Sequence, residues 1–196
     1  SVTIATGPGV FLRVAVGHFG KLTGAVISPI LQIMFAFPEV LLALLIMSIL
    51  GPSLNNIMIA IGIVYTPIFA RITRGAVLSV KDSLYVEAAR SIGVKDSTII
   101  VRHILPNILS PILVQVTLSL AFAILSEAAL SFLGIGVEPD VPSWGIMLNN
   151  GKAWIEIAWW VGVFPGIAIA LAVLGFNVLG DGLRDVLDPR LRNVED

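Results

Sequence analysis

Four long apolar runs constrain the fold of this chain more than any other feature of its sequence. A bilayer core about 30 Å thick is crossed by about 20 residues of α-helix. Runs near this length cover residues 26–50, 53–70, 107–133 and 157–179. They do not alternate between apolar and polar residues, as the strands of a membrane β-barrel do. The runs therefore predict an all-α protein, a polytopic transmembrane helical bundle, with residues 1–196 forming one domain.

The chain carries too little charge to cover a water-exposed surface. Charged residues make up 13% and apolar residues 57% of the sequence, whereas a soluble domain carries about 25% charged residues. This balance excludes a disordered protein, a nucleic-acid binder and an ordinary cytosolic enzyme, and it makes membrane lipid the main solvent. The sequence has no cysteine, which excludes disulfides and thiol chemistry.

A fifth apolar segment, residues 2–19, is interrupted and makes a weaker span. It contains Gly7-Pro8-Gly9 and Arg13, and both proline and a charged residue disfavour a membrane helix. Counting this segment gives about five spans. The first 20 residues do not follow the basic start, apolar middle and small-residue cleavage site of a signal peptide, so we expect none.

The basic residues indicate which loops face the cytoplasm, because cytoplasmic loops are enriched in lysine and arginine. Residues 71–102 hold six of the 12 basic residues, and three more follow residue 179. The segment 134–156 holds only Lys152. We therefore expect a multi-pass protein of the plasma (inner) membrane. Residues 71–102 and the C-terminus are then cytoplasmic, and 134–157 form an extracytoplasmic loop.

The segment 79–106 is too polar to span a membrane, yet its pattern predicts a helix–turn–helix. Ser79-Val80-Lys81-Asp82 resembles a capping box that opens a helix. Gly93 stands where a helix ends in a left-handed residue, and Asp96 or Ser97 then caps a second helix that runs toward Pro106. Apolar residues recur at four-residue steps along the first helix. This stripe consists of Val80, Leu84, Ala88 and Ile92.

Two interpretations of this loop remain open from its pattern alone. It is either an interfacial hairpin that only connects two spans, or a docking element for a soluble partner. The small residues Ala88, Ala89 and Gly93 favour docking because a partner can approach the backbone closely. Glu87 and Arg90 flank them and would orient the contact.

Several motifs of the chain resemble those of ABC importer permeases. Glu87-Ala88-Ala89, Gly93 and Leu105-Pro106 follow the spacing of the EAA motif of that family. The segments 103–107, 127–134 and 180–190 and the sequence Pro142-Ser143-Trp144-Gly145 are similar to the branch that imports dipeptides, oligopeptides and nickel. Over about residues 17–192, the chain resembles the second permease subunit of such importers.

The resemblance implies a type I ABC importer permease fold and a set of partners. These are ABC ATPase subunits, a sister permease and an extracytoplasmic substrate-binding protein. The chain itself would then be no enzyme and hold no cofactor, because ATP and Mg²⁺ bind to the ATPases. Consistently, neither Gly20-Lys21-Leu22 nor Gly151-Lys152-Ala153 continues as a phosphate-binding loop.

The resemblance also implies which residues of the loop 79–106 couple to the ATPases. They are Glu87, Ala88, Ala89, Arg90, Gly93, Leu105 and Pro106. Two positions depart from the family pattern, since Pro29 and Gln32 stand where relatives usually carry arginine and aspartate. Family members usually have a further N-terminal helix, so we expect this chain to be short of at least one helix.

Three residues are candidates for the translocation path or a gate. Glu127 and Glu39 are ionisable residues inside apolar runs, where a charge costs about 2.5–3.5 kcal/mol at the helix centre. A structural hydrogen bond near the interface explains Glu127 equally well. Trp144 lies in the loop motif that resembles the family and would form part of the outer mouth. His18 and His103 are too far apart to form a metal site.

The sequence thus predicts a permease subunit that forms a translocation path with a second permease and imports peptides or nickel. It does not identify the substrate. Two alternatives remain. One is a secondary transporter that couples to ions through Glu127 or Glu39, and the other is a degenerate, non-transporting membrane scaffold.

Overall fold

The computed structural model describes residues 21–187, and for residues 21–28 only the backbone. This part of the chain contains helices and no β-strand, which confirms the predicted all-α class. The α-helices are α2 (Lys21–Ala36), α3 (Glu39–Leu50), α4 (Leu54–Lys81), α5 (Leu84–Ser91), α6 (Asp96–Ile99), α7 (Leu105–Phe132), α8 (Trp144–Gly151) and α9 (Trp160–Leu187). A π-helix, η1 (Ile100–Ile104), joins α6 to α7, and a 3₁₀ turn, η2 (Lys152–Trp154), follows α8.

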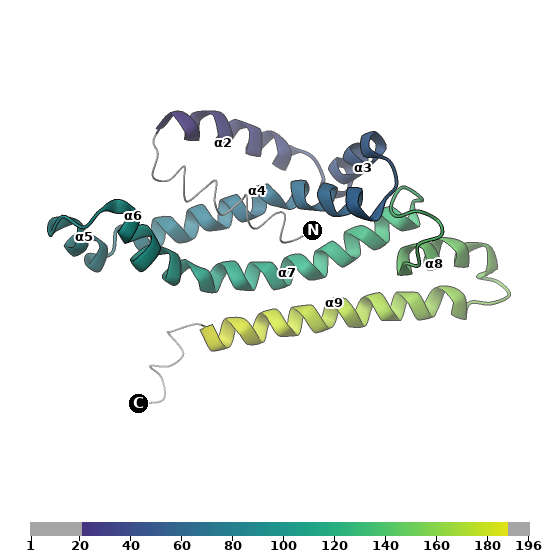
Figure 1. Cartoon of the computed structure of the whole chain (residues 1–196). Coiled ribbons are helices and arrows are strands. Elements are labelled where there is room, and N and C mark those ends of the chain that lie inside the picture. The colour runs from purple at the N-terminus through teal and green to yellow at the C-terminus, as the bar shows by residue number, and fades with distance from the viewer. Residues whose placement is uncertain (1–20, 188–196) are drawn as a thin grey trace.

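Three long helices, α4, α7 and α9, lie side by side and form the body of the molecule (Figure 1). Each has 28 residues, or about 42 Å at 1.5 Å per residue, which exceeds a hydrocarbon core of about 30 Å. All three are apolar enough to span a membrane. The predicted runs 53–70, 107–133 and 157–179 are therefore confirmed as spans, although α4 and α9 extend beyond them to Lys81 and Leu187.

The predicted span over residues 26–50 is not one continuous helix. The chain breaks at Phe37–Pro38, and the axes of α2 and α3 differ in direction by 100°. Pro38 has no backbone N–H and disfavours helix in the residue before it. It adopts an extended conformation, and its carbonyl oxygen accepts a hydrogen bond from the Leu42 N–H at 3.0 Å, which starts α3. The described residues thus contain three helices that could span a membrane, or four if the bent pair is one span.

The predicted span at residues 2–19 lies outside the described residues. The estimate of about five spans therefore remains a prediction for the whole chain. Within the described part, α2 packs against α4, where the Arg71 guanidinium lies 3.7 Å from the centroid of the Phe35 ring. This cation–π contact joins α2 to α4, an outer helix of the three-helix body.

Two apolar clusters form the core, one toward each end of the bundle. The first joins α3, α4 and α7 around the fully buried Met47, Ile57, Phe69 and Leu130. The second joins the loop helices to α7 and contains Val86, Ala89, Ile99, Ile104, Ile108 and Ile112. Helix α9 runs antiparallel to α7, and Gly180 packs directly on the Thr117 side chain. Most of α9 is exposed in this chain, as lipid-facing or subunit-facing helices are.

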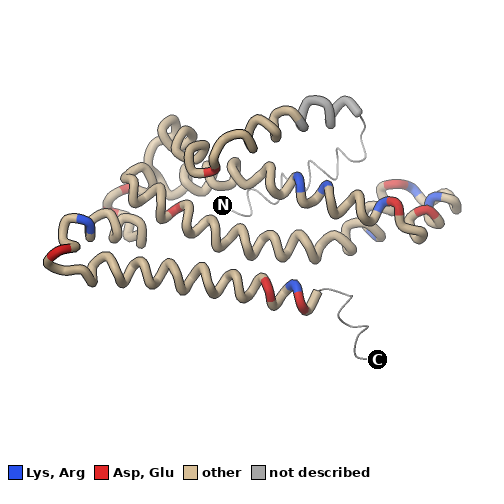
Figure 2. Tube along the Cα trace, turned by 180° about the vertical axis from the view of Figure 1, so that it is seen from behind, with Lys and Arg blue, Asp and Glu red and all other residues tan. Residues whose placement is uncertain are grey.

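The two ends of the bundle differ in charge (Figure 2). The end that carries α5 and α6, here called the α5 end, gathers most of the lysine and arginine residues and also contains the C-terminus of α9. The opposite end carries α8 and the loop 133–143 and is called the α8 end. Its loop and helix region, residues 134–156, includes Lys152 as the single basic residue. The basic residues that the sequence groups in one loop and one tail thus gather at one end of the long axis of the molecule, as far as the described residues extend.

Candidate functional site

The first loop helix begins later than its sequence predicts. Ser79 lies inside α4, where its hydroxyl donates to the Ala76 carbonyl at 2.8 Å. Ser83 precedes α5 as the N-cap residue, and its hydroxyl donates to the Val80 carbonyl at 2.6 Å instead of capping α5. The capping-box prediction at 79–82 is therefore wrong. Ala76 and Val80 pack against the apolar cluster under the loop, and this packing extends α4 to Lys81.

Gly93 ends α5 in the left-handed conformation, as predicted, with φ of 79°. The Val94 N–H donates to the Ala89 carbonyl at 3.1 Å and the Gly93 N–H to the Arg90 carbonyl at 2.9 Å. These bonds satisfy carbonyl groups that the end of a helix leaves unpaired. Across the turn, the Arg90 Nε lies 3.9 Å from Asp96 Oδ1.

We predict that Gly93→Ala destabilises this turn by about 1–2 kcal/mol, because an L-residue is strained at positive φ. A Cβ at Gly93 would meet no atom within 4 Å, so the strain is confined to the backbone. Amide hydrogen exchange across residues 84–95 would report the change as faster opening. Gly75→Ala is the matched control, since Gly75 also has open space but an ordinary helical φ. Equal exchange rates in the two variants would contradict the prediction.

The second loop helix does not stop at Pro106. It starts at Asp96, with Lys95 as the N-cap, and widens into the π-helix η1 before it continues as α7. The Leu105 N–H reaches back to the Ile100 carbonyl, five residues earlier. Pro106 has no N–H for the Arg102 carbonyl, so an ordinary α-helical bond is not available at this point. The motif residues Leu105 and Pro106 thus mark the junction between the loop and the long helix α7.

Helix α5 buries one face and exposes the other. Val86 and Ala89 are 0% and 7% exposed and pack against isoleucines of α6, η1 and α7. On the opposite face, Leu84 and Ile92 are 84% and 80% exposed, and Ala88 between them is also exposed. We call Leu84, Ala88 and Ile92 the α5 outer face. Three of the four residues of the predicted stripe therefore point away from the protein.

The other motif residues divide between these two faces. Glu87, Arg90 and Gly93 are exposed beside the α5 outer face. Ala89, predicted as a contact residue, instead points into the apolar cluster and is unavailable to a partner. Leu105 is half-buried and packs against the same cluster, whereas Pro106 is exposed. The motif as a whole therefore builds a supported helix, and only part of it faces outward.

At the α8 end, close backbone contacts hold α8 and the preceding loop against α7. A Cβ at Gly136 would collide with the Ser131 side chain, and a Cβ at Gly145 would lie 2.5 Å from the Ala128 carbonyl oxygen. Ser143 caps α8 by accepting a hydrogen bond from the Ile146 N–H at 3.1 Å. The sequence marked Gly145 only as part of a motif and did not mark Gly136, because the need for a missing side chain is visible only once α7 and α8 are placed together.

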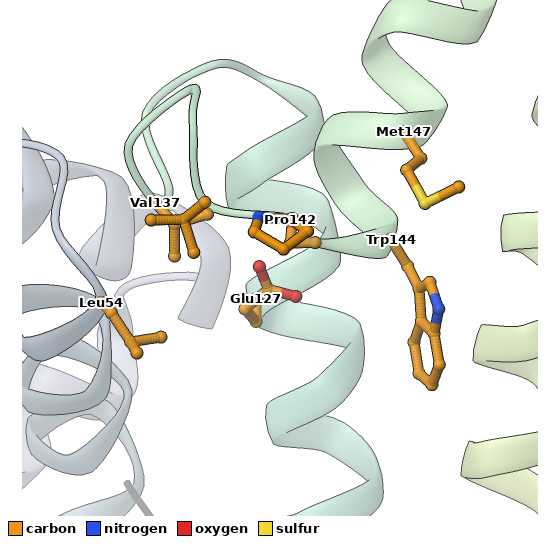
Figure 3. Close-up of a pocket in the computed structure, with 8 residues that line it drawn as sticks. Leu54, Glu127, Val137, Pro142, Trp144 and Met147 are labelled. Carbon is orange, nitrogen blue, oxygen red and sulfur yellow. The ribbon is translucent and has the colours of Figure 1, made fainter.

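This packing forms a pocket of about 370 Å³ around Glu127 (Figure 3). Glu127 comes from α7 and Trp144 and Met147 from α8, while Leu54 and Val137 stand on the other side. The Ser131 hydroxyl donates to Glu127 Oε1 at 2.7 Å, and this hydroxyl also accepts the Val137 N–H at 3.4 Å. The predicted residues Glu127 and Trp144 thus line one cavity, and the structural hydrogen bond considered for Glu127 exists as well.

Glu39 does not belong to that pocket. It starts α3 and lines a separate cavity of about 250 Å³ with residues of α2 and α4, such as Phe35 and Pro67. Its carboxylate accepts a hydrogen bond from the Tyr65 hydroxyl at 3.5 Å, and that hydroxyl lies 3.5 Å from Ser126 Oγ. Tyr65 was not predicted, although a tyrosine in the middle of an apolar run is a signal for a buried polar contact.

Metal-binding chemistry finds no support in the described part of the chain. No three histidine, cysteine, aspartate or glutamate residues between residues 21 and 187 lie close enough to hold a metal ion. His18 lies outside the described residues. His103 is in η1, with its ring 6.3 Å from the ring of Tyr85. The two features of the described residues that best suit binding are the α5 outer face and the pocket around Glu127.

Comparison with known proteins gives several extended matches. The chain is 48% identical over 193 residues to the dipeptide transport system permease protein DppC of Alkalihalophilus pseudofirmus, covering 98% of this chain and 64% of that protein. It is 46% identical over 194 residues to the di/tripeptide transport system permease protein DppC of Pseudomonas aeruginosa, with 99% and 64% covered. The glutathione transport system permease protein GsiD of Escherichia coli O157:H7 is 49% identical over 166 residues, which are 85% of this chain and 55% of that protein.

A solved structure titled as an inward-facing conformation of the MetNI methionine ABC transporter has a similar fold. The TM-score is 0.71 at 19% identity, over 95% of this chain and 87% of that chain. This likeness confirms the predicted fold of an ABC importer permease. The chain spans about two thirds of the length of the two DppC proteins. A family model described as "Binding-protein-dependent transport system inner membrane component" matches residues 9–193, and the chain belongs to this family.

Proposed function

We propose that the protein is a permease subunit of an ATP-driven importer of short peptides and that α5 docks onto an ATPase subunit. The family consists of inner membrane components of binding-protein-dependent transport systems, and the three named relatives transport dipeptides, di/tripeptides or glutathione by name. Nickel, which the motifs also allowed, is named for none of these three and stays an untested prediction. The family gives no support to an ion-coupled transporter or a scaffold.

The α5 outer face carries the docking proposal. An exposed apolar stripe on a polar, charge-rich end of a protein marks an interaction surface. Leu84 and Ile92 stand at its two ends, Ala88 allows close approach at its centre, and Glu87 and Arg90 offer charges beside it. An interfacial hairpin would instead turn these residues toward lipid, so the docking experiment below also tests that interpretation.

The packing beneath α5 would transmit a movement of the docked partner to the membrane helices. Val86 and Ala89 of α5 share one apolar cluster with Ile99 of α6, Ile104 of η1 and Ile108 of α7. Residues of α4 pack against the same cluster. Since interiors are close-packed, a displaced α5 would move the adjoining ends of α4 and α7 with it. Closure of the ATPases would in this way alternate the access of the translocation path.

We place the α5 end in the cytoplasm, together with residues 71–102, the loop 79–106 and the C-terminus. The enrichment of basic residues at that end supports this orientation. The loop 134–157 would then be extracytoplasmic and face a substrate-binding protein. We further propose that a sister permease completes the path and that ATP and Mg²⁺ bind to the ATPase subunits, with no cofactor in this chain. Exposed leucines of α9 would face lipid or the sister permease.

Cysteine crosslinking tests the docking proposal directly, because the sequence contains no cysteine. We expect Ala88→Cys to crosslink to a cysteine on the ATPase surface in the assembled complex, with a yield that changes when nucleotide binds. Ala89→Cys is the matched control, since Ala89 is the next residue along α5 and its side chain is only 7% exposed and points inward. A complex that purifies with its ATPases but crosslinks equally, or not at all, at both positions would refute docking through α5. Identification of the co-purified subunits tests the wider proposal.

A further inference from the structure

The carboxylate of Glu127 has no cationic partner among the described residues. Among these residues Glu127 accepts one hydrogen bond, from the Ser131 hydroxyl to Oε1, and its second carboxylate oxygen has no partner there. The ion pairs of the described part of the chain lie elsewhere, at the α5 end. A carboxylate on a membrane helix normally faces an interior site and is matched by an opposite charge. A cation from outside these residues would therefore complement Glu127.

The walls of the pocket indicate what kind of cation fits. Leu54, Val137 and Met147 are apolar, and the aromatic side chain of Trp144 also lines the pocket. An indole attracts a cation through its ring electrons, and an apolar wall favours organic over strongly hydrated inorganic ions. The volume of about 370 Å³ lies near the lower limit of small-molecule pockets, which span about 300–1,000 Å³. It suits one end of an amphipathic cation rather than a long chain.

The site is held in place by its surroundings. Ser131 fixes one oxygen of Glu127, and Ser131 is itself fixed by the Val137 N–H. The close contact of Gly145 with Ala128 sets the position of α8 and thus of Trp144. The pocket therefore needs little rearrangement to receive a ligand, which reduces the entropy lost on binding.

We propose that this pocket binds the protonated amino terminus of a short peptide, with Glu127 as counter-ion and Trp144 as an aromatic wall. The inference rests on the proposed function, since it takes peptides as the cargo and the α8 end as the side of entry. A charge-assisted hydrogen bond from the ammonium group would occupy the free oxygen of Glu127. The apolar residues would accept the first side chain of the peptide.

Equilibrium binding of radiolabelled alanyl-alanine to the assembled transporter in lipid nanodiscs tests the proposal, without nucleotide or binding protein. We expect saturable binding that N-acetyl-alanyl-alanine does not displace, because acetylation removes the charge. Glu127→Gln should weaken binding about tenfold, as expected for the loss of one charged hydrogen bond. Glu156→Gln is the control, since Glu156 is an exposed carboxylate of the same region that does not line the pocket.

Trp144→Leu provides a second variant should Glu127→Gln fail to assemble. We expect it to bind alanyl-alanine with several-fold lower affinity, while the complex keeps its elution volume in size-exclusion chromatography. Equal affinity in the wild-type protein and both variants, or no binding at all, would overturn the inference. So would loss of the sister permease from the Glu127→Gln complex, because Glu127 would then pair with that subunit. If ATP-driven peptide uptake persists while the pocket binds nothing, the inference fails and the proposed function stands. If no ATPase co-purifies, the proposed function fails independently.

Discussion

Gly145→Val is expected to prevent α8 from packing on α7 and to destabilise the protein by more than about 4 kcal/mol. Single substitutions reach such values only when they severely disrupt the core. A Cβ at this position would lie 2.5 Å from the Ala128 carbonyl oxygen and 2.9 Å from the Ala128 Cα. These are backbone atoms of α7, so no change of rotamer relieves the overlap. The helix would have to move away and would lose the hydrogen bond from the Asn149 amide to the Phe132 carbonyl.

The unfolding midpoint of the purified protein in lipid nanodiscs measures this effect. Gly175→Ala is the matched control because a Cβ at Gly175, inside α9, meets no atom within 4 Å. Alanine replaces glycine in a helix interior with a gain of about 0.5–1 kcal/mol, so the control should unfold at the same or a higher temperature. A Gly145→Val protein that unfolds with the wild-type midpoint would show that α8 is not packed on α7 as described.

Helix α7 was the most predictable element, because its apolar run is long and ends at a glycine turn. The prediction of 107–133 differs from the observed Leu105–Phe132 by two residues at one end and one at the other. The ends of α4 and α9 were less predictable, since both helices continue into polar sequence. Arginine and lysine end an apolar run but are good helix formers, so Arg71 and Arg74 do not stop α4.

The prolines show why the break after α2 could not be located from sequence. Pro67 and Pro165 lie inside continuous helices, whereas Pro38 separates α2 from α3. Neighbouring helices can satisfy the backbone groups that a proline frees within a membrane helix. The difference therefore depends on packing: Met47 of α3 is fully buried against α4 only because the chain turns at Pro38.

The candidate sites were predictable as residues but not as surfaces. Both faces of α5 carry apolar side chains, so periodicity alone did not reveal that Val86 points inward and Leu84 outward. Glu127 was identified by residue type and Trp144 by the loop motif, and the two share one pocket. Glu39 has the same chemistry as Glu127 and lies in another cavity. Proximity between distant segments is a property of the tertiary packing, which a single sequence does not record.

Under the proposed function, Leu84→Glu is expected to leave the protein folded and to abolish its coupling to the ATPases. Leu84 is 84% exposed, and a substitution at such a surface changes stability by only about 0.5 kcal/mol. In a docked complex the same carboxylate would enter an apolar contact. Loss of a large apolar contact residue from an interface costs about 2 kcal/mol or more, which is about a 30-fold loss of affinity. Titration of the purified ATPase onto the permease complex, followed by assays of ATP-driven uptake, measures both consequences.

Val186→Glu separates docking from a general effect of negative charge at the α5 end. Val186 lies near the end of α9, is 79% exposed and is not part of the α5 outer face. The Val186→Glu protein should bind the ATPase and support uptake as the wild-type protein does. Comparable losses in both variants would mean that charge at this end, rather than the α5 outer face, controls assembly. Full uptake by the Leu84→Glu protein would exclude α5 as the coupling element, because an exposed apolar face that tolerates a charge has no apolar partner.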